Sequence, residues 1–418
     1  MNAPHEKPAS AGTGPLSGYR VLEMGSTVAG PFCGRLLADF GAEVIKVETP
    51  DGDPVRTMGK QFHGKSLYAA SILRNKSLVS IDLRKPEGQA LIRELASHCD
   101  VIVENFRPGG LEKWGLGYAD LSAINPRLIM VRISGFGQSG PYSQRAGYGV
   151  IGEAVSGIRH LTGDPDRPPA RVAVSMTDYI TGLYAAFGAA LALLARTATG
   201  RGQVIDAALY ECAFSFMEPW IPAYEKLGHV ANRCGPRLPE STPNNLFVTA
   251  DGEFIHITAM GDAVFRRLSE VMAQPELAND PRFCSAHARN ANHEAIDDLI
   301  AGWTAQHALV HLERLLADAG VPATRVFTIA DIFGDPHYRA RGAIVAAADE
   351  DLGSVAMANV VPRLSQTPGS VRHAGRRVGQ DTRQVLHDLL ALDAIQLDAL
   401  EAAGVIASRP SNASVTTG

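Results

Sequence analysis

Apolar and polar positions in the first half of the chain follow two alternating periods. Short apolar runs predict strands at residues 19–24, 43–48, 77–83, 100–104 and 128–133. Helical patterns separate some of these runs, at residues 31–41, where Pro31 stands in the first turn, and at residues 86–97. Strands separated by helices of this length imply a parallel sheet with right-handed crossovers. The pattern therefore predicts an α/β domain up to about residue 210.

The second half of the chain has a different texture. Prolines recur from Pro219 to Pro243 and predict a linker, and residues 245–258 predict a hairpin that turns at Asp251-Gly252. Helical patterns follow at residues 263–272, 293–304 and 309–319, strand patterns return at 343–361, and a last helix is predicted at 381–392. The expected organisation is a leader (1–17), a large domain (18–220), a linker (221–245), a small α+β domain (246–330), a C-terminal segment (331–408) and a tail (409–418).

Composition narrows the class of protein. The chain has 418 residues, a net charge of −5, 45% hydrophobic residues and 20% charged residues, which is typical of a folded globular protein. Without a sustained basic run, nucleic acid is not an expected partner. The five cysteines are scattered and form no C-x-x-C pair, so neither a disulfide framework nor a metal site is expected. With no secretion signal evident, we expect a cytoplasmic protein.

One uncharged segment raises the question of a membrane. Residues 179–195 lie between Asp178 and Arg196 and are rich in Ala and Gly. The segment is shorter than the roughly 20 apolar residues that span a bilayer. We therefore predict a buried, closely packed helix and no membrane partner.

A G-x-G-x-x-G motif, Gly135 to Gly140, follows the predicted strand at 128–133. A dinucleotide-binding fingerprint needs a helix that opens on these glycines, but Pro141, Gly147 and Gly149 follow closely. The pattern favours a loop that lets a ligand approach the backbone rather than a nicotinamide or flavin site.

Asp178 directly precedes the uncharged segment. It has two compatible interpretations: an N-cap that accepts backbone hydrogen bonds, or a nucleophile kept ionised at a helix N-terminus. The spacing alone does not choose between them.

Several blocks in chain order carry a resemblance. They include Leu16-Ser-Gly-Tyr-Arg-Val-Leu-Glu23, Gly41-Ala-Glu-Val-Ile-Lys-Val-Glu48, Val103-Glu-Asn-Phe106, Ser134-Gly-Phe-Gly-Gln-Ser-Gly-Pro141 and Thr199-Gly-Arg-Gly-Gln203. Together they resemble family III CoA-transferases of the CaiB/BaiF type, over nearly the whole chain from Leu16 to Thr382. The resemblance implies an interlocked homodimer, each chain having a Rossmann-like large domain, completed by the C-terminal segment, and a smaller α+β domain.

The resemblance also implies a reaction. Asp178 would attack an acyl-CoA thioester and carry the acyl group and then CoA, through an aspartyl anhydride and an aspartyl-CoA thioester. CoA thioesters would be substrates, with no permanently bound cofactor and no metal. The overall texture is similar to members that move CoA between dicarboxylates, such as succinate and a branched C5 or C6 diacid.

The resemblance also implies a set of site residues, most of which follow the predicted strands. The implied CoA contacts are Val28, Ala29, Thr49, Ile81, Asp82, Leu83, Arg84, Asn105, Phe106, Arg107, Lys113, Ser134, Gly135, Phe136 and Gly137. Arg84, Arg107 and Lys113 would supply positive charge for the CoA phosphates. Amide groups from Gly135 to Gly137 would stabilise oxyanions, and Tyr68 would line the substrate pocket.

Two other functions stay open on the same residues. One is a 2-methylacyl-CoA racemase, whose second base is a histidine where this chain has Tyr148. The other is a CoA-binding protein without activity. Oxalate specificity is not expected, because the glycine run of the oxalate enzymes is reduced here to Ala259-Met-Gly-Asp262.

Overall fold

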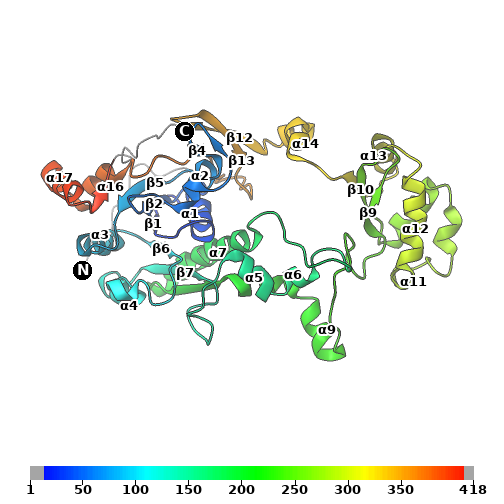
Figure 1. Cartoon of the computed structure of the whole chain (residues 1–418), viewed down its shortest axis with the longest axis horizontal. Helices are drawn as coiled ribbons and strands as arrows, with labels where there is room; N and C mark the ends of the chain where they lie inside the picture. The colour runs from blue at the N-terminus through cyan, green and yellow to red at the C-terminus, as the bar shows by residue number, and fades with distance from the viewer. Residues whose placement is uncertain (1–13, 409–418) are drawn as a thin grey trace. The chain divides into compact units, whose positions relative to one another are not determined.

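The computed structural model describes residues 14–408, which form two compact units (Figure 1). The first unit contains residues 14–158, 173–222 and 339–408, and the second contains residues 159–172 and 223–338. The expected tail at 409–418 and residues 1–13 of the expected leader lie outside the described residues.

A seven-stranded sheet forms the centre of the first unit. Its strand order is β14-β5-β2-β1-β6-β7-β8, and every neighbouring pair is parallel except β14 with β5. The strands are β1 (Arg20–Glu23), β2 (Glu43–Glu48), β5 (Ser77–Ile81), β6 (Val101–Glu104), β7 (Ile129–Ser134), β8 (Val204–Ala208) and β14 (Ile406–Ala407). The predicted parallel α/β architecture is confirmed. The two outermost strands were missed because β14 has only two residues and β8 carries Asp206 on a largely exposed stretch.

Helices cover both faces of this sheet. On one face, α1 (Ala29–Asp39) and α7 (Met176–Thr199) pack on strand residues such as Val21, Val103 and Val131. On the other face, strand residues such as Leu22, Ile102 and Met130 share a core with α3 (Pro86–Ser97), α4 (Tyr118–Ile124), α16 (Thr382–Leu390) and α17 (Ala394–Ala402). Alternate residues of each strand thus serve two cores, which explains why these strands are almost continuously apolar.

Helix α7 differs from its prediction in length. It has 24 residues, so by length and composition it could cross a membrane, and the expectation that it was too short is wrong. One face of α7, including Ala185, Ala189 and Ala192, is buried in the core beside α1. A core helix of this kind passes the same length test, so the packing supports the predicted core position.

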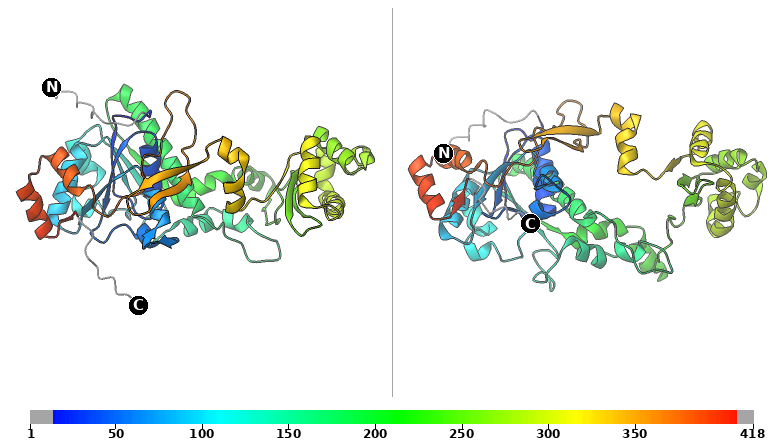
Figure 2. Two further views of the ribbon diagram at one scale, coloured as in Figure 1. Left: turned by 90° about the horizontal axis from the view of Figure 1, so that it is seen from above. Right: turned by 45° about the horizontal axis from the view of Figure 1, so that its top comes forward.

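The second unit is built around a three-stranded antiparallel sheet. The predicted hairpin is confirmed as β9 (Asn244–Val248) and β10 (Phe254–Thr258), and β11 (Ala323–Arg325) joins on the other side of β10. Three predicted helices, α10 (Asp262–Val271), α12 (His293–Thr304) and α13 (Leu309–Asp318), lie in the same unit as this sheet (Figure 2). Their buried side chains form one apolar core with those of the sheet.

Shorter elements complete the described chain. They are η1 (Pro54–Thr57), β3 (Gln61–Phe62), β4 (Lys65–Ser66), α2 (Leu67–Ile72), η2 (Glu112–Trp114), α5 (Gly149–Val155), α6 (Ile158–Leu161), α8 (Leu209–Phe214), η3 (Ser215–Met217), α9 (Trp220–Leu227), η4 (Pro275–Asn279), α11 (Ala286–Ala291), α14 (Ile329–Gly334), α15 (Pro336–Ala340), β12 (Ile344–Asp349) and β13 (Gly353–Ala358).

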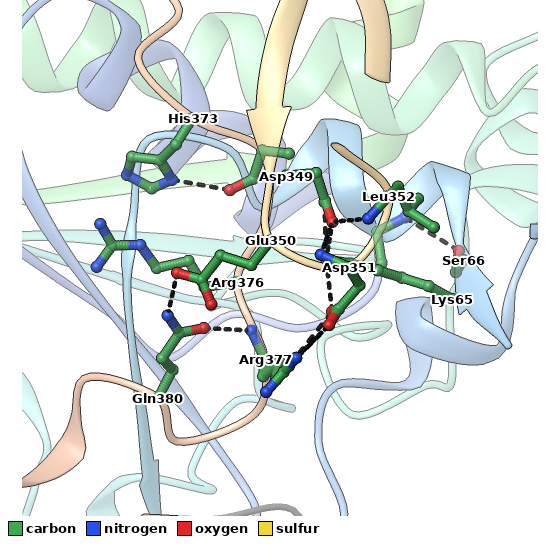
Figure 3. A network of polar contacts seen from close by, with 12 residues as sticks. Lys65, Ser66, Asp349, Glu350, Asp351, Leu352, His373, Arg376, Arg377 and Gln380 are labelled. Atoms are coloured by element: carbon green, nitrogen blue, oxygen red, sulfur yellow. Dashed lines mark hydrogen bonds and ion pairs between the residues drawn. The ribbon is translucent and has the colours of Figure 1, made fainter. Parts of the chain in front are cut away.

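A polar network anchors the β12–β13 turn within the first unit (Figure 3). Lys65 Nζ lies 2.7 Å from Asp349 Oδ2 and 3.3 Å from Asp351 Oδ2. The Arg377 guanidinium also pairs with Asp351, and Gln380 Nε2 donates to Glu350 Oε1 over 2.7 Å. These contacts join β4, the hairpin turn and the C-terminal segment, which are far apart in sequence.

The anchoring of this turn is expected to weaken in acid. The hydrogen bond from Arg377, with help from Lys65 and against the effect of burial, lowers the pKa of Asp351. Its stabilising contribution is therefore full above the unfolded pKa of about 3.9 and is lost as the pH falls through the lower folded pKa. The contribution is small because the pair is partly exposed. In the native protein, the hydrogen-exchange protection of residues 349–353, corrected for intrinsic rates, should therefore decrease as the pH falls below about 3.9. In Asp351→Asn it should already be reduced at neutral pH, and equal protection in both proteins would contradict the assignment.

Candidate active site

A pocket of about 450 Å³ opens at the carboxyl edge of the parallel sheet in the first unit. The chain leaves β1 towards β2 and β5 on one side and returns to β6 on the other, so the sheet reverses its strand order between β1 and β6. Ligands of open α/β sheets bind at such switch points. The lining residues are Ser26, Thr27, Val28, Ala29, Pro54, Asn105, Phe106, Arg107, Pro108, Ile133, Ser134, Gly135, Ser143, Arg145, Ala146, Gly147, Tyr148, Asp178 and Leu209.

Asp178 reaches this pocket from the first turn of α7. The helix begins at Met176 with Ser175 as its N-cap, so the N-cap interpretation of Asp178 is wrong by three positions. Its half-buried carboxylate lies instead inside the first turn, where the helix dipole favours the ionised form. An ionised carboxylate in a pocket is a chemically competent nucleophile.

Gly149, the first residue of α5, lies directly against Asp178. A β-carbon at position 149 would overlap Oδ2 of the Asp178 carboxylate. Only glycine therefore leaves room for this carboxylate at its observed position. The sequence contains the glycine, but the contact joins α5 and α7, and no sequence pattern predicts that these two helices meet.

The loop after β1 forms one wall of the pocket. Thr27 has a φ of 69°, an uncommon conformation for a residue with a branched side chain. Ser26, the residue before Thr27, is held through its backbone by the side chain of Asn105 from the loop after β6. Ser26 N donates to Asn105 Oδ1 over 2.8 Å, and Asn105 Nδ2 donates to Ser26 O over 2.9 Å. The loops after β1 and β6 are thus tied together across the switch point.

Two arginines bring positive charge to the lining. Arg107 follows β6, and the guanidinium of Arg145 lies 3.5 Å from the ring centroid of Tyr142. The base of the β6 loop is held by Glu104, which accepts from Phe106 N over 2.8 Å and pairs with Arg132 Nε at 2.7 Å. Burial raises the pKa of Glu104, although the hydrogen bond from Arg132 opposes this effect. The arrangement suits an anionic ligand.

The glycine-rich loop after β7 contributes backbone to the pocket. Gly135 lines the pocket and Gly137 does not. The Gly137 N–H is already engaged, since it donates to Ser134 Oγ over 2.9 Å. The next described helix, α5, begins only at Gly149. The motif therefore lacks the helix that a dinucleotide fingerprint requires, as its spacing predicted.

The structure divides the residues that the resemblance implied. Pocket-lining positions are Val28, Ala29, Asn105, Phe106, Arg107, Ser134, Gly135 and Asp178. Outside the lining are Thr49, Ile81, Asp82, Leu83, Arg84, Lys113, Phe136, Gly137 and Tyr68.

Most of the outlying residues still follow strands of the same edge. Thr49 comes after β2, and Asp82 to Arg84 come after β5. Ile81 and Leu83 are buried in the core, whereas the exposed Arg84 pairs with Asp82 at 2.8 Å.

Tyr68 lies beside the pocket rather than in it. Tyr179, the residue after Asp178, donates its hydroxyl to Tyr68 Oη over 2.9 Å. Burial, this hydrogen bond and the nearby Asp178 charge raise the pKa of Tyr68, so its hydroxyl stays neutral.

Sequence reasoning missed a set of lining residues, among them Ser26, Thr27, Pro54, Ser143 and Leu209. Leu209 follows the unpredicted strand β8, so no signal marked it. Ser26 and Thr27 directly precede the implied contacts Val28 and Ala29, and their position after a strand was the available signal. Among the described residues no group of three His, Cys, Asp or Glu side chains could hold a metal ion.

Known proteins are similar to this chain in sequence and in fold. The sequence profile of CoA-transferase family III matches residues 16–382. A succinyl-CoA–D-citramalate CoA-transferase of Chloroflexus aurantiacus is 50% identical over 394 residues, which cover 94% of this chain and 98% of that protein. The beta subunit of a succinyl-CoA–L-malate CoA-transferase of the same organism is 43% identical over 94% of this chain and 98% of its own length.

A solved structure supports the same relationship. The crystal structure of a CaiB/BaiF family protein from Brucella suis matches with a TM-score of 0.80 and 37% identity, over 90% of this chain and 99% of that one. Profile, relatives and fold thus agree over nearly the full length. The chain belongs to CoA-transferase family III.

Proposed function

We propose that this CoA-transferase moves CoA from succinyl-CoA to a second dicarboxylate, with Asp178 as the nucleophile. The observation that carries the proposal is the position of Asp178 in a pocket at the sheet edge, together with two arginines. The names of the related succinyl-CoA-dependent transferases support the choice of donor.

The proposed reaction has four displacements, two at the acyl carbons of the donor and acceptor and two at the carboxyl carbon of Asp178. Asp178 attacks the thioester carbonyl, the C–S bond breaks, and CoA thiolate leaves a mixed anhydride behind. The thiolate attacks the aspartyl carbonyl and expels the donor acid, giving an aspartyl-CoA thioester. The acceptor carboxylate then displaces the thiolate, and the thiolate attacks the acceptor acyl carbon, which releases the new thioester and restores Asp178.

We further propose how the pocket lining serves CoA and the acid. Val28, Ala29 and the segment from Asn105 to Arg107 would hold the thioester arm of CoA, and Gly135 would place backbone near the developing oxyanion. The exposed sheet edge with Arg84 and Lys113 would take the phosphates. Arg145 would pair with the carboxylate of the acid that does not react.

A homodimer is part of the proposal. Within the first unit, α7 leaves Leu183, Phe187, Leu191 and Leu194 exposed at spacings that place them on one side of the helix. An apolar stripe of this kind supports association with a second copy of the chain.

Trapping with hydroxylamine tests the nucleophile. In the presence of succinyl-CoA and hydroxylamine, mass spectrometry should find a hydroxamate on Asp178, because both covalent intermediates are activated aspartyl acyl groups. Asp178→Ala should lose about 10⁴-fold or more in kcat while still binding CoA. Asp120→Ala, which removes an exposed first-turn carboxylate of α4, is the matched control and should transfer CoA normally. Wild-type transfer by Asp178→Ala would refute the mechanism.

Gly149→Ala tests the space around the carboxylate. The added methyl group would push Asp178 away from the reacting carbonyl, so kcat should fall about 10²-fold with CoA affinity retained. Gly302→Ala on α12, where a β-carbon meets open space, serves as the control and should leave kcat unchanged. Similar rates for the two alanine variants would show that the Asp178–Gly149 contact is not needed.

A panel of acceptors tests the substrate class. With succinyl-CoA as the donor, glutarate and a branched C5 dicarboxylate should be used at least about 10²-fold more efficiently than butyrate, because only the diacids offer Arg145 a second carboxylate. Arg145→Gln should reduce this ratio by raising KM for the diacids without changing KM for butyrate. An unchanged ratio in the variant would remove Arg145 from the proposal.

A further inference from the structure

Four charged side chains form a row inside the first unit, beneath the pocket wall. Glu23 ends β1, Lys46 lies opposite it on β2, Asp53 follows β2, and Lys76 precedes β5. Their side chains are at most 1% exposed. Lys76 Nζ lies 2.6 Å from Glu23 Oε2, Lys46 Nζ lies 3.4 Å from Glu23 Oε1, and Lys46 Nζ lies 2.8 Å from Asp53 Oδ2. We call these four residues the buried charge row.

The row alternates two basic with two acidic side chains. Burial lowers the pKa of Lys76, although the charge of Glu23 opposes this effect. Burial disfavours the ammonium of Lys46, but the charges of Asp53 and Glu23 outweigh this effect and raise the pKa of Lys46. Burial likewise opposes ionisation of Asp53, yet Lys46 and two backbone N–H groups hold the pKa of Asp53 below its usual range. Both groups are therefore charged at neutral pH, and removal of either would leave an uncompensated buried charge.

Each cation, and one anion, also contacts the segment that leads from β1 into α1. Lys46 Nζ donates to Gly25 O, and Lys76 Nζ donates to Pro31 O over 2.7 Å. Thr27 N donates to Asp53 Oδ1 over 3.0 Å. Residues 25–31 are thus held at three backbone positions by buried charges that come from neighbouring strands and loops.

The held segment is the wall of the pocket. Ser26, Thr27, Val28 and Ala29 line it together with Asp178. The bond to Asp53 ends on Thr27, the residue with the left-handed backbone conformation, which needs surrounding contacts to persist. Glu23 is enclosed on the other side by Gly34 of α1, where a β-carbon would overlap its carboxylate.

Stability alone does not account for such a row. Buried ion pairs can often be replaced by apolar residues of similar size without loss of stability, because desolvation offsets their attraction. What an apolar replacement cannot supply is a set of directed hydrogen bonds to Gly25 O, Thr27 N and Pro31 O. The function of the row therefore lies in where it holds the backbone.

We propose that Glu23, Lys46, Asp53 and Lys76 are positioning residues of the transferase, which hold residues 25–31 so that the pocket wall faces Asp178 in its reactive geometry. The inference rests on the proposed function, in which this wall holds the thioester arm of CoA. None of the four residues lines the pocket, so they act through the backbone.

A charge-balanced double variant separates positioning from stability. Lys46→Met and Asp53→Ala singly should lower both the melting temperature and kcat/KM, since each leaves an unpaired buried charge. Lys46→Met/Asp53→Ala keeps the Lys76–Glu23 pair and restores the charge balance, so its melting temperature should recover towards the wild-type value. Its kcat/KM for succinyl-CoA should stay about 10²-fold down, because Gly25 O and Thr27 N remain unanchored. Recovery of kcat/KM together with the melting temperature would overturn the proposal.

The control is a second buried ion pair at the far end of α1. Arg74 NH2 lies 2.6 Å from Asp39 Oδ2, and both side chains are at most 1% exposed. Asp39→Ala/Arg74→Met should keep kcat/KM within about twofold of wild type when assayed below its melting temperature. A loss equal to that of the Lys46/Asp53 double variant would show a general effect of buried charges and would also overturn the proposal.

Two further measurements keep the test decisive. If the double variant does not recover its fold, Asp53→Asn is compared with Asp53→Ala, since Asn retains an oxygen for Thr27 N; equal kcat/KM in the two would contradict positioning. Hydrogen exchange of residues 25–31 should quicken in the Lys46/Asp53 variants and not in the Asp39/Arg74 control. Hydrogen exchange does not require turnover, so it tests whether the buried charge row holds residues 25–31 independently of the proposed function. Absence of the Asp178 hydroxamate in the wild-type protein would refute the proposed function without deciding this test.

Discussion

The parallel direction of the central strands is the constraint on which the rest of this structure depends. Because β5, β2, β1, β6 and β7 run the same way, every loop that follows them leaves at one edge of the sheet. The reversal of strand order between β1 and β6 separates two of these loops and leaves the space that becomes the pocket. Residues as distant in sequence as Val28, Asn105 and Ser134 meet there for this reason.

The loops at this edge contain a strained backbone conformation and a buried charge, and buried polar contacts stabilise both. The loop after β1 includes a non-glycine residue with positive φ, and the loop after β6 starts from the buried Glu104. Asn105, Arg132 and the buried charge row supply the hydrogen bonds that hold these loops. Charged residues of this row lie beside two apolar cores and bond to the backbone of the loop that lines the pocket.

Long, strongly patterned elements were predictable, and short or contact-dependent ones were not. The helix at residues 86–97 and the strand at 43–48 have the predicted bounds, because apolar periodicity and a proline mark them. Strand β8 escaped prediction because it is largely exposed and carries Asp206, and α7 was predicted too short because its first and last turns are polar. Asp178 was identified as a candidate, but its place inside the first turn rather than at the N-cap depends on where the helix begins.

The sequence by itself determined the α/β class, the family and the candidate carboxylate, because periodicity, motif order and spacing are properties of the chain alone. Only the tertiary structure decided which implied contacts share a pocket with Asp178 and which lie further along the sheet edge. It also decided that Gly149 must be small and that Lys46 and Asp53 act on a backbone segment upstream of them. These facts depend on distances between segments remote in sequence, which are set when the strands pair and the helices pack.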